Sequence, residues 1–202
     1  MKKLIYHRDG DIIRHLIKKD GHLEELFAQP EEVVVNLIDA SFAALAEAIV
    51  AQQLSGRVAE VIWGRVKTLL NNRIEPEEVL KAESDELRKC GLSSRKAEYI
   101  QSLATKVISK EVDFNNIENK SNQEIIDMLV KVKGIGPWTA EMFLMFSLGR
   151  EDVFSVLDLG LRNGLQKLYK REMTHEEMME ISKKWSPYQS VVSHYLWRYN
   201  QR

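Results

Sequence analysis

The chain has 202 residues, of which 44% are hydrophobic and 29% are charged, and its formal net charge is −1 at pH 7. This composition is ordinary for a soluble globular protein, and the near-neutral charge excludes nucleic-acid binding by bulk attraction alone. The single cysteine, Cys90, excludes an internal disulfide and a four-cysteine zinc or iron–sulfur site. No apolar run is long enough to cross a membrane, and the start MKKLIYHRDGD turns polar after two lysines, which favours a cytoplasmic protein.

Apolar spacing predicts helices nearly throughout the first half of the chain. The segment 41–53 places Leu45, Ala48 and Ile49 on one helical face, and Pro76 and Ser84 each begin a short helix. The exception is the β-branched run Val33–Val35, which favours an extended segment without an obvious partner. We therefore expect a mainly helical fold in which this run is a connection or a lone short strand.

The second half carries clear helix-start signals. They are a capping box of Ser121 with Glu124 opening 122–132, a second of Thr174 with Glu177 opening 175–184, and the sequence Ser186-Pro187 with Gln189 before the last helix. Polar linkers are expected at 71–78 and 112–123.

Residues 132–142, VKGIGPWTAEM, predict a glycine turn between two helices. Gly134 and Gly136 allow unusual backbone angles and a close backbone approach, and Pro137 is suited to the first turn of a helix. The free N–H groups at such a helix start attract a phosphate without any basic side chain. Asp158 follows twenty positions after Trp138, in VFSVLDLGLRNGL.

This hairpin and aspartate resemble a known family. The stretch from Met128 to Leu165 resembles the helix-hairpin-helix (HhH-GPD) DNA glycosylase superfamily, and GIGPWTA is most similar to its 3-methyladenine (alkylpurine) DNA glycosylase II branch. Segments 48–66, 91–104 and 185–197 also resemble that branch, so the resemblance covers roughly residues 8–200.

The resemblance implies an all-α fold with two helical lobes around a central cleft. The whole chain, 1–202, would form a single glycosylase unit. One lobe would span about 41–133, and the other about 1–40 plus 134–202, with the helix-hairpin-helix motif at about 122–147.

Asp158 is the catalytic residue that the resemblance implies. A carboxylate near the sugar stabilises the oxocarbenium-like transition state of base release and orients the attacking water. Asp158 also fits an N-cap, and both roles can hold together. Arg162, one turn later, would pair with Asp158 or reach a phosphate. Trp138 stands where strand-nicking relatives carry a Schiff-base lysine, which predicts a monofunctional enzyme that leaves an abasic site.

Flipping a base requires a side chain that fills the gap in the duplex. By resemblance, the turn Gln52–Ser55 carries this wedge, with Gln53 at its position and Leu54 as the alternative. The glutamines also fit a simple helix cap. The list of expected DNA contacts is Gln52, Gln53, Leu54, Ser55, Gly134, Gly136, Thr139 and Arg162.

The base pocket is expected at Tyr188 and Trp138, because a cationic alkylpurine needs an electron-rich surface to stack on. An aromatic stripe also fits a core, and Trp185, Tyr195 and Trp197 crowd the same helix as Tyr188. By resemblance, backbone carbonyls of Val130, Val132 and Ile135 would hold a structural Na⁺ or K⁺. No other cofactor is required, and no iron–sulfur cluster is expected.

The sequence therefore predicts a DNA glycosylase that excises 3-methyladenine- and 7-methylguanine-type bases in base excision repair. Its partner would be double-stranded DNA with damaged bases, bound by a cytoplasmic, nucleoid-associated monomer. The alternatives are a glycosylase for uracil, a deaminated or an oxidised purine, and a non-catalytic DNA-binding module. Asp158 separates enzyme from module, whereas the hairpin contacts only backbone and does not separate the lesion classes.

Overall fold

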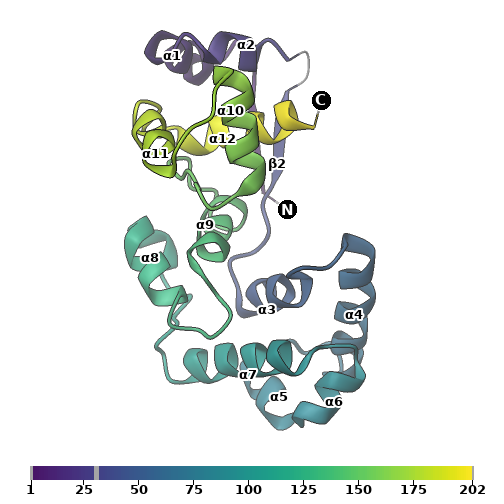
Figure 1. The fold of residues 1–202 in the computed structure, drawn as a ribbon. Coiled ribbons are helices and arrows are strands. Elements are labelled where there is room, and N and C mark those ends of the chain that lie inside the picture. The colour runs from purple at the N-terminus through teal and green to yellow at the C-terminus, as the bar shows by residue number, and fades with distance from the viewer. Residues whose placement is uncertain (1, 30–31, 202) are drawn as a thin grey trace. The chain divides into compact units, whose positions relative to one another are not determined.

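The computed structural model describes residues 2–29 and 32–201, which form twelve α-helices, one short 3-10 helix and a two-stranded sheet (Figure 1). The predicted all-α class is therefore confirmed, with the sheet as a small addition. The chain divides into two compact units, Asp39–Phe143 and the pair Met1–Ile38 with Leu144–Arg202. We call the first the central unit and the second the terminal unit. Within the described residues, no helix has the length and apolar character needed to cross a membrane.

The central unit is built around its longest helix. Its elements are α3 (Phe42–Ala51), α4 (Gly56–Leu69), α5 (Pro76–Lys81), α6 (Ser84–Lys89), α7 (Ser94–Ile108), the 3-10 helix (Ile117–Asn119), α8 (Asn122–Leu129) and the first part of α9 (Pro137–Phe146). Helix α7 buries Ala97, Ile100, Leu103 and Ala104, whose spacing forms one apolar stripe. It packs against α3, α5 and α6.

The terminal unit combines segments from both ends of the chain. Its elements are β1 (Lys3–Tyr6), α1 (Asp11–Lys19), α2 (Leu23–Phe27), β2 (Val33–Asn36), the end of α9, α10 (Leu159–Tyr169), α11 (His175–Lys183) and α12 (Gln189–Asn200). Helix α12 buries every residue from Ser190 to Leu196 and packs against α10 and α2. It is therefore the centre of this unit, as Figure 1 shows.

The valine run is a paired strand and not an isolated segment. Strand β2 pairs antiparallel with β1, with Lys3 opposite Asn36 and Tyr6 opposite Val33. Val33 and Val35 are buried while Val34 is exposed, as the alternation of a strand requires. The expectation of a partnerless run was wrong because its partner is only four residues long and lies about thirty positions earlier, where no local signal reveals it.

The helix-start signals are confirmed with small shifts at the ends. Both capping boxes form, Ser121 with Glu124 on α8 and Thr174 with Glu177 on α11. The last helix begins at Gln189, directly after the Ser186-Pro187 signal, and Tyr188 is its N-cap residue.

The boundary between the units lies at 143, and not near 133 as the resemblance implied. The reason is that the first turns of α9 pack within the central unit. Ala140 is fully buried, and the Phe143 ring lies 6.3 Å from the ring of Phe114. The cleft that the resemblance implies between the lobes stays a prediction.

A buried carboxylate ties the terminal unit together. Asp20 follows α1 and is 7% exposed. It accepts hydrogen bonds from the Tyr169 hydroxyl, from Trp185 Nε1 at 2.9 Å, and from the backbone and ring of His22 at 3.1 Å. Burial by itself raises the pKa of Asp20, but these hydrogen bonds outweigh it and hold the pKa below its ordinary value. Asp20 therefore joins α1 and α2 to α10 as a charged acceptor.

Replacing this acceptor should weaken the terminal unit. We expect Asp20→Ala to lower the free energy of unfolding at pH 7 by about 2–4 kcal/mol, because buried donors of Tyr169 and Trp185 lose their partner. A folded-state pKa below the unfolded one stabilises above the unfolded pKa, so the deficit should shrink as the pH falls below about 4. Urea unfolding at several pH values measures this. Asp113→Ala is the control, and an equal loss in both variants would contradict the role of Asp20.

Candidate functional site

Asp158 lies at the N-terminus of α10, where two donors fix its carboxylate. Its Oδ1 accepts the backbone N–H of Leu161 at 2.9 Å, which confirms the N-cap. The same oxygen accepts Trp197 Nε1–H of α12 at 2.8 Å. These two donors, one from the backbone of α10 and one from a side chain of α12, hold the carboxylate in place while the residue stays partly exposed.

The contact between Asp158 and Trp197 depends on a glycine. A Cβ at Gly160 would lie 2.9 Å from Trp197 Cδ1 and 3.1 Å from Asp158 Oδ1, so a larger residue would force the indole away. On its other side, the Trp197 ring stacks on Phe146 of α9 with centroids 5.5 Å apart and planes at 30°. The indole is thus held by packing, and it holds the carboxylate in turn.

Two exposed leucines flank the carboxylate. Leu157 is 48% exposed and Leu159 is 61% exposed, which is unusual for large apolar side chains. A ligand that covered them would remove water from the surroundings of Asp158, and the electrostatic effect of the carboxylate would then increase.

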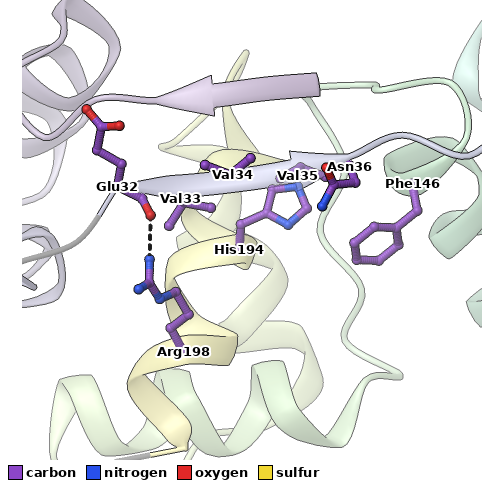
Figure 2. A pocket seen from close by; sticks show the side chains of 8 residues that line it. All are labelled: Glu32, Val33, Val34, Val35, Asn36, Phe146, His194 and Arg198. Carbon is purple, nitrogen blue, oxygen red and sulfur yellow. Dashed lines mark hydrogen bonds between the residues drawn. The ribbon is translucent and has the colours of Figure 1, made fainter. Parts of the chain in front are cut away.

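A groove of about 480 Å³ lies along β2, as Figure 2 shows. Its lining residues are Glu32, Val33, Val34, Val35, Asn36, Phe146, His194 and Arg198. Arg198 donates to the Glu32 carbonyl at 2.7 Å and joins α12 to the start of the strand. Burial lowers the pKa of His194 to about 4, so its ring is neutral near pH 7. The rings of Phe146 and His194 lie within 5.6 Å of the Trp197 ring, so this groove adjoins the packing behind Asp158.

Two residues expected at the site have other contacts in the terminal unit. The Tyr188 ring meets His15 edge-on at 5.9 Å and packs on the core, which fits the alternative reading as a core aromatic. Trp197, nine positions along α12, lies on the opposite face of the helix and contacts Asp158. Arg162 Nη1 lies 2.8 Å from His175 Nε2. The base-pocket role of Tyr188 stays a prediction.

In the central unit, the hairpin turn requires glycine at one of its two positions. Gly134 has φ +84°, and a Cβ there would lie 2.1 Å from Tyr99 Cδ2. At Gly136 a Cβ would meet nothing within 4 Å, and the residue is exposed. The fold therefore explains Gly134 but not Gly136, whose small size leaves room for an external ligand at the start of α9.

The residues after this turn differ in exposure. Trp138 is 41% exposed, so it offers an aromatic surface to solvent. Thr139, expected to contact DNA, is buried at 9% exposure. Its backbone remains part of the first turn of α9, where N–H groups lack helical partners.

The turn from Gln52 to Ser55 projects from the same unit as the hairpin. Gln53 has φ +56° and is exposed, and Leu54 is 37% exposed. Ser55 occupies the N-cap position of α4. Gln52 differs from its neighbours because its Nε2 donates to the Gly134 carbonyl at 2.9 Å. The predicted wedge residues are thus at the tip, while Gln52 is directed at the hairpin.

One of the hairpin carbonyls expected to hold a cation already accepts a backbone hydrogen bond. The Val132 carbonyl accepts the N–H of Ile135 at 3.1 Å, and a carbonyl oxygen has a second lone pair. Over residues 2–29 and 32–201, no group of three or more His, Cys, Asp or Glu side chains could hold a metal ion. Any cation at the hairpin would therefore rely on backbone oxygens.

Sequence reasoning missed the supporting residues. Trp197 was interpreted only as one of several aromatics on a helix, and Gly160 was not singled out. A glycine two residues after the N-cap aspartate was the one available signal, because glycine is unfavourable inside a helix without a packing reason.

The chain is similar to several known proteins. The model of the HhH-GPD superfamily of base excision DNA repair proteins matches residues 46–187. DNA-3-methyladenine glycosylase 1 of Schizosaccharomyces pombe is 36% identical over 159 residues, covering 76% of this chain and 70% of that protein. DNA-3-methyladenine glycosylase of Saccharomyces cerevisiae is 32% identical over 228 aligned positions, covering 91% and 77%. The crystal structure of a DNA-3-methyladenine glycosidase from Bacillus halodurans gives a TM-score of 0.90 at 36% identity, covering 98% and 92%.

The two hairpin glycines should respond differently to substitution. We expect Gly134→Ala to lower the free energy of unfolding by about 2–4 kcal/mol, because the new Cβ needs a positive φ and overlaps the Tyr99 ring. Gly136→Ala should change it by less than about 1 kcal/mol, because its Cβ enters open space. Thermal and urea unfolding of both variants measures the difference. Equal destabilisation would show that the close approach of Tyr99 does not determine residue 134.

Proposed function

This chain belongs to the HhH-GPD superfamily of base excision DNA repair proteins, and we propose that it is a monofunctional DNA glycosylase for alkylated purines. Its reaction would be hydrolysis of the N-glycosidic bond of a flipped 3-methyladenine- or 7-methylguanine-type nucleotide, leaving an abasic site. The observation that carries the proposal is the Asp158 carboxylate, fixed by Leu161 and Trp197 yet accessible to a ligand.

The proposed role of Asp158 is electrostatic. Departure of the base leaves positive charge on the sugar, and a fixed carboxylate stabilises that charge without reorganising during the reaction. The same carboxylate can accept a proton from the attacking water. The N-cap bond and the indole bond to Oδ1 keep the carboxylate in place for this role.

The substrate class follows from what the site must supply. An alkylated purine is cationic and therefore leaves without a general acid, so a carboxylate and an aromatic surface are sufficient. The exposed ring of Trp138 is one candidate surface. Relatives described as DNA-3-methyladenine glycosylases support the same class.

The absence of strand cleavage follows from Trp138. Covalent catalysis at this hairpin position needs an amine that attacks the sugar, and an indole has no such nucleophile. Water is then the attacking group, and the product is an intact strand with an abasic site.

Binding to damaged double-stranded DNA is assigned mainly to backbone groups of the central unit. The start of α9, with exposed Gly136 and Pro137, presents N–H groups that suit a phosphate. Gln53 and Leu54 are the proposed wedge, since both are exposed at the tip of their turn. A monomer is proposed as the active form.

A Na⁺ or K⁺ is proposed at the hairpin, held by the carbonyls of Val130, Val132 and Ile135. It would add a positive charge beside the phosphate that the α9 N-terminus binds. The residues of this chain would still position the phosphate through their N–H groups.

The function is tested by incubating the protein with methylated duplex DNA and identifying the free base. We expect release of alkylated purines and a strand that breaks only after alkali treatment. Asp158→Asn should lower excision at least about 100-fold, as expected when a principal electrostatic group is lost, while affinity for abasic-site DNA stays nearly unchanged. Near-normal excision by the variant would contradict the assignment of Asp158, and strand cleavage without alkali would contradict the monofunctional mechanism.

The support given by Trp197 has its own test. We expect Trp197→Phe to lower the excision rate about tenfold, because Asp158 loses a charge-assisted hydrogen bond while the aromatic packing is largely kept. DNA affinity should stay the same. Trp63→Phe, which changes a more deeply buried indole of the central unit, is the control for a general loss of aromatic packing. Equal losses in rate for the two variants would show a general effect of stability.

A further inference from the structure

One face of α7 contacts both turns that are proposed to bind DNA. Lys96, Tyr99 and Ser102 lie three residues apart and therefore on one side of the helix. Within the central unit, Lys96 contacts the turn Gln52–Ser55, which we call the wedge turn. Tyr99 and Ser102 contact residues 130–136, which we call the hairpin turn.

The contacts with the hairpin turn fix its backbone. The Tyr99 ring fills the space beside Gly134, and the Ser102 hydroxyl accepts the N–H of Lys133 at 3.4 Å. Lys133 also pairs with Glu98 of α7 at 2.6 Å. That exposed ion pair contributes little stability, so the ring contact is the main restraint.

The contacts with the wedge turn come from a single ammonium group. Lys96 Nζ donates to the carbonyls of Val50 at 2.7 Å and Gln52 at 2.6 Å, at the C-terminus of α3. A cation is favourable there because the last carbonyls of a helix lack partners and carry negative potential. Burial lowers the pKa of Lys96, in agreement with a position against the backbone.

A direct bond then joins the two turns. Gln52 Nε2 donates to the Gly134 carbonyl at 2.9 Å, across 82 positions of sequence. The backbone of Gln52 is held by Lys96 and its side chain holds the hairpin, so this residue belongs to both networks. Its neighbour Gln53 is exposed with φ +56°, whereas the Gln52 side chain is bonded to the hairpin.

We propose that Gln52 is a positioning residue that fixes the wedge turn relative to the hairpin turn, with Lys96 supporting it. The hairpin binds the phosphate backbone, and the Gln52 bond to Gly134 places Gln53 and Leu54 at a set distance from that phosphate. The wedge is therefore inserted at a fixed distance from the phosphate of the DNA strand that the hairpin binds. Gln52 itself does not contact DNA in this scheme. The inference rests on the proposed function, because it assumes that both turns bind DNA.

The test measures wedge insertion without requiring catalysis. A duplex with a tetrahydrofuran abasic analogue carries 2-aminopurine in the base pair next to the gap, so insertion changes its fluorescence. We expect Gln52→Met and Gln52→Glu, which both lack the donor, to weaken insertion about fivefold or more, the effect of one lost hydrogen bond. Affinity for an undamaged duplex should change less than about twofold, because that affinity comes from phosphate contacts.

A matched variant and a double-mutant cycle separate positioning from stability. Gln101→Met removes a similar amide bond, from Nε2 to the Ala82 carbonyl in the same unit, together with the bond that Oε1 accepts from Ser84, and should leave insertion unchanged. In a variant with Gln53→Ala and Leu54→Ala together, adding Gln52→Met should have no further effect, because Gln52 acts through those side chains.

The outcomes are distinguishable. An equal loss in Gln101→Met, an additive loss in the cycle, or parallel losses of insertion and undamaged-duplex affinity would each overturn the positioning role. Wild-type protein that inserts its wedge but releases no methylated base would contradict the proposed function, while a loss of insertion in the two Gln52 variants would still support the role of Gln52. Wild-type protein that does not bind the abasic duplex would overturn both.

Discussion

The close approach of the Tyr99 ring to Gly134 is the constraint on which the central unit depends most. Any Cβ at residue 134 would overlap that ring, so the turn is compatible only with glycine in its positive-φ conformation. This conformation directs the Gly134 carbonyl at Gln52 and sets where α9 begins. One packing contact therefore determines both the link to the wedge turn and the position of the free N–H groups proposed to bind phosphate.

The terminal unit also has a glycine that permits the close approach of an aromatic ring, with a different result. Gly160 lets the Trp197 indole approach α10, as Gly134 lets the Tyr99 ring approach the hairpin. In the first case the approach fixes a side-chain carboxylate, and in the second it fixes a backbone turn. Rigid supports of this kind are needed wherever a group must act without moving during the reaction.

The parts of the structure that depend on neighbouring residues could be predicted from the sequence. The capping box of Ser121 and Glu124 is complete within four residues, and it forms as expected. The N-cap role of Asp158 is local in the same way. The partner of β2 could not be predicted, because strand pairing joins distant segments and β1 is too short to have a recognisable pattern.

The residues that hold the candidate site in place could not be predicted from the sequence for the same reason. Trp197 reaches Asp158 across 39 positions, and Gln52 reaches Gly134 across 82. An aromatic on a mostly buried helix looks like core, and a glutamine in a turn looks like a surface contact. Their roles become visible only when the donors and acceptors they meet are known.

The charge distribution fits the chemistry proposed for the site. Both a cationic alkylpurine and the sugar it leaves carry positive charge, so lysines or arginines beside the reacting bond would oppose the reaction. The residues directly flanking Asp158 are leucines, and the groups proposed to bind phosphate are backbone N–H donors that add no mobile cation. A net charge of −1 is then no obstacle to binding DNA. Backbone donors supply the attraction for phosphate where it is needed and leave the carboxylate as the charged group next to the developing cation.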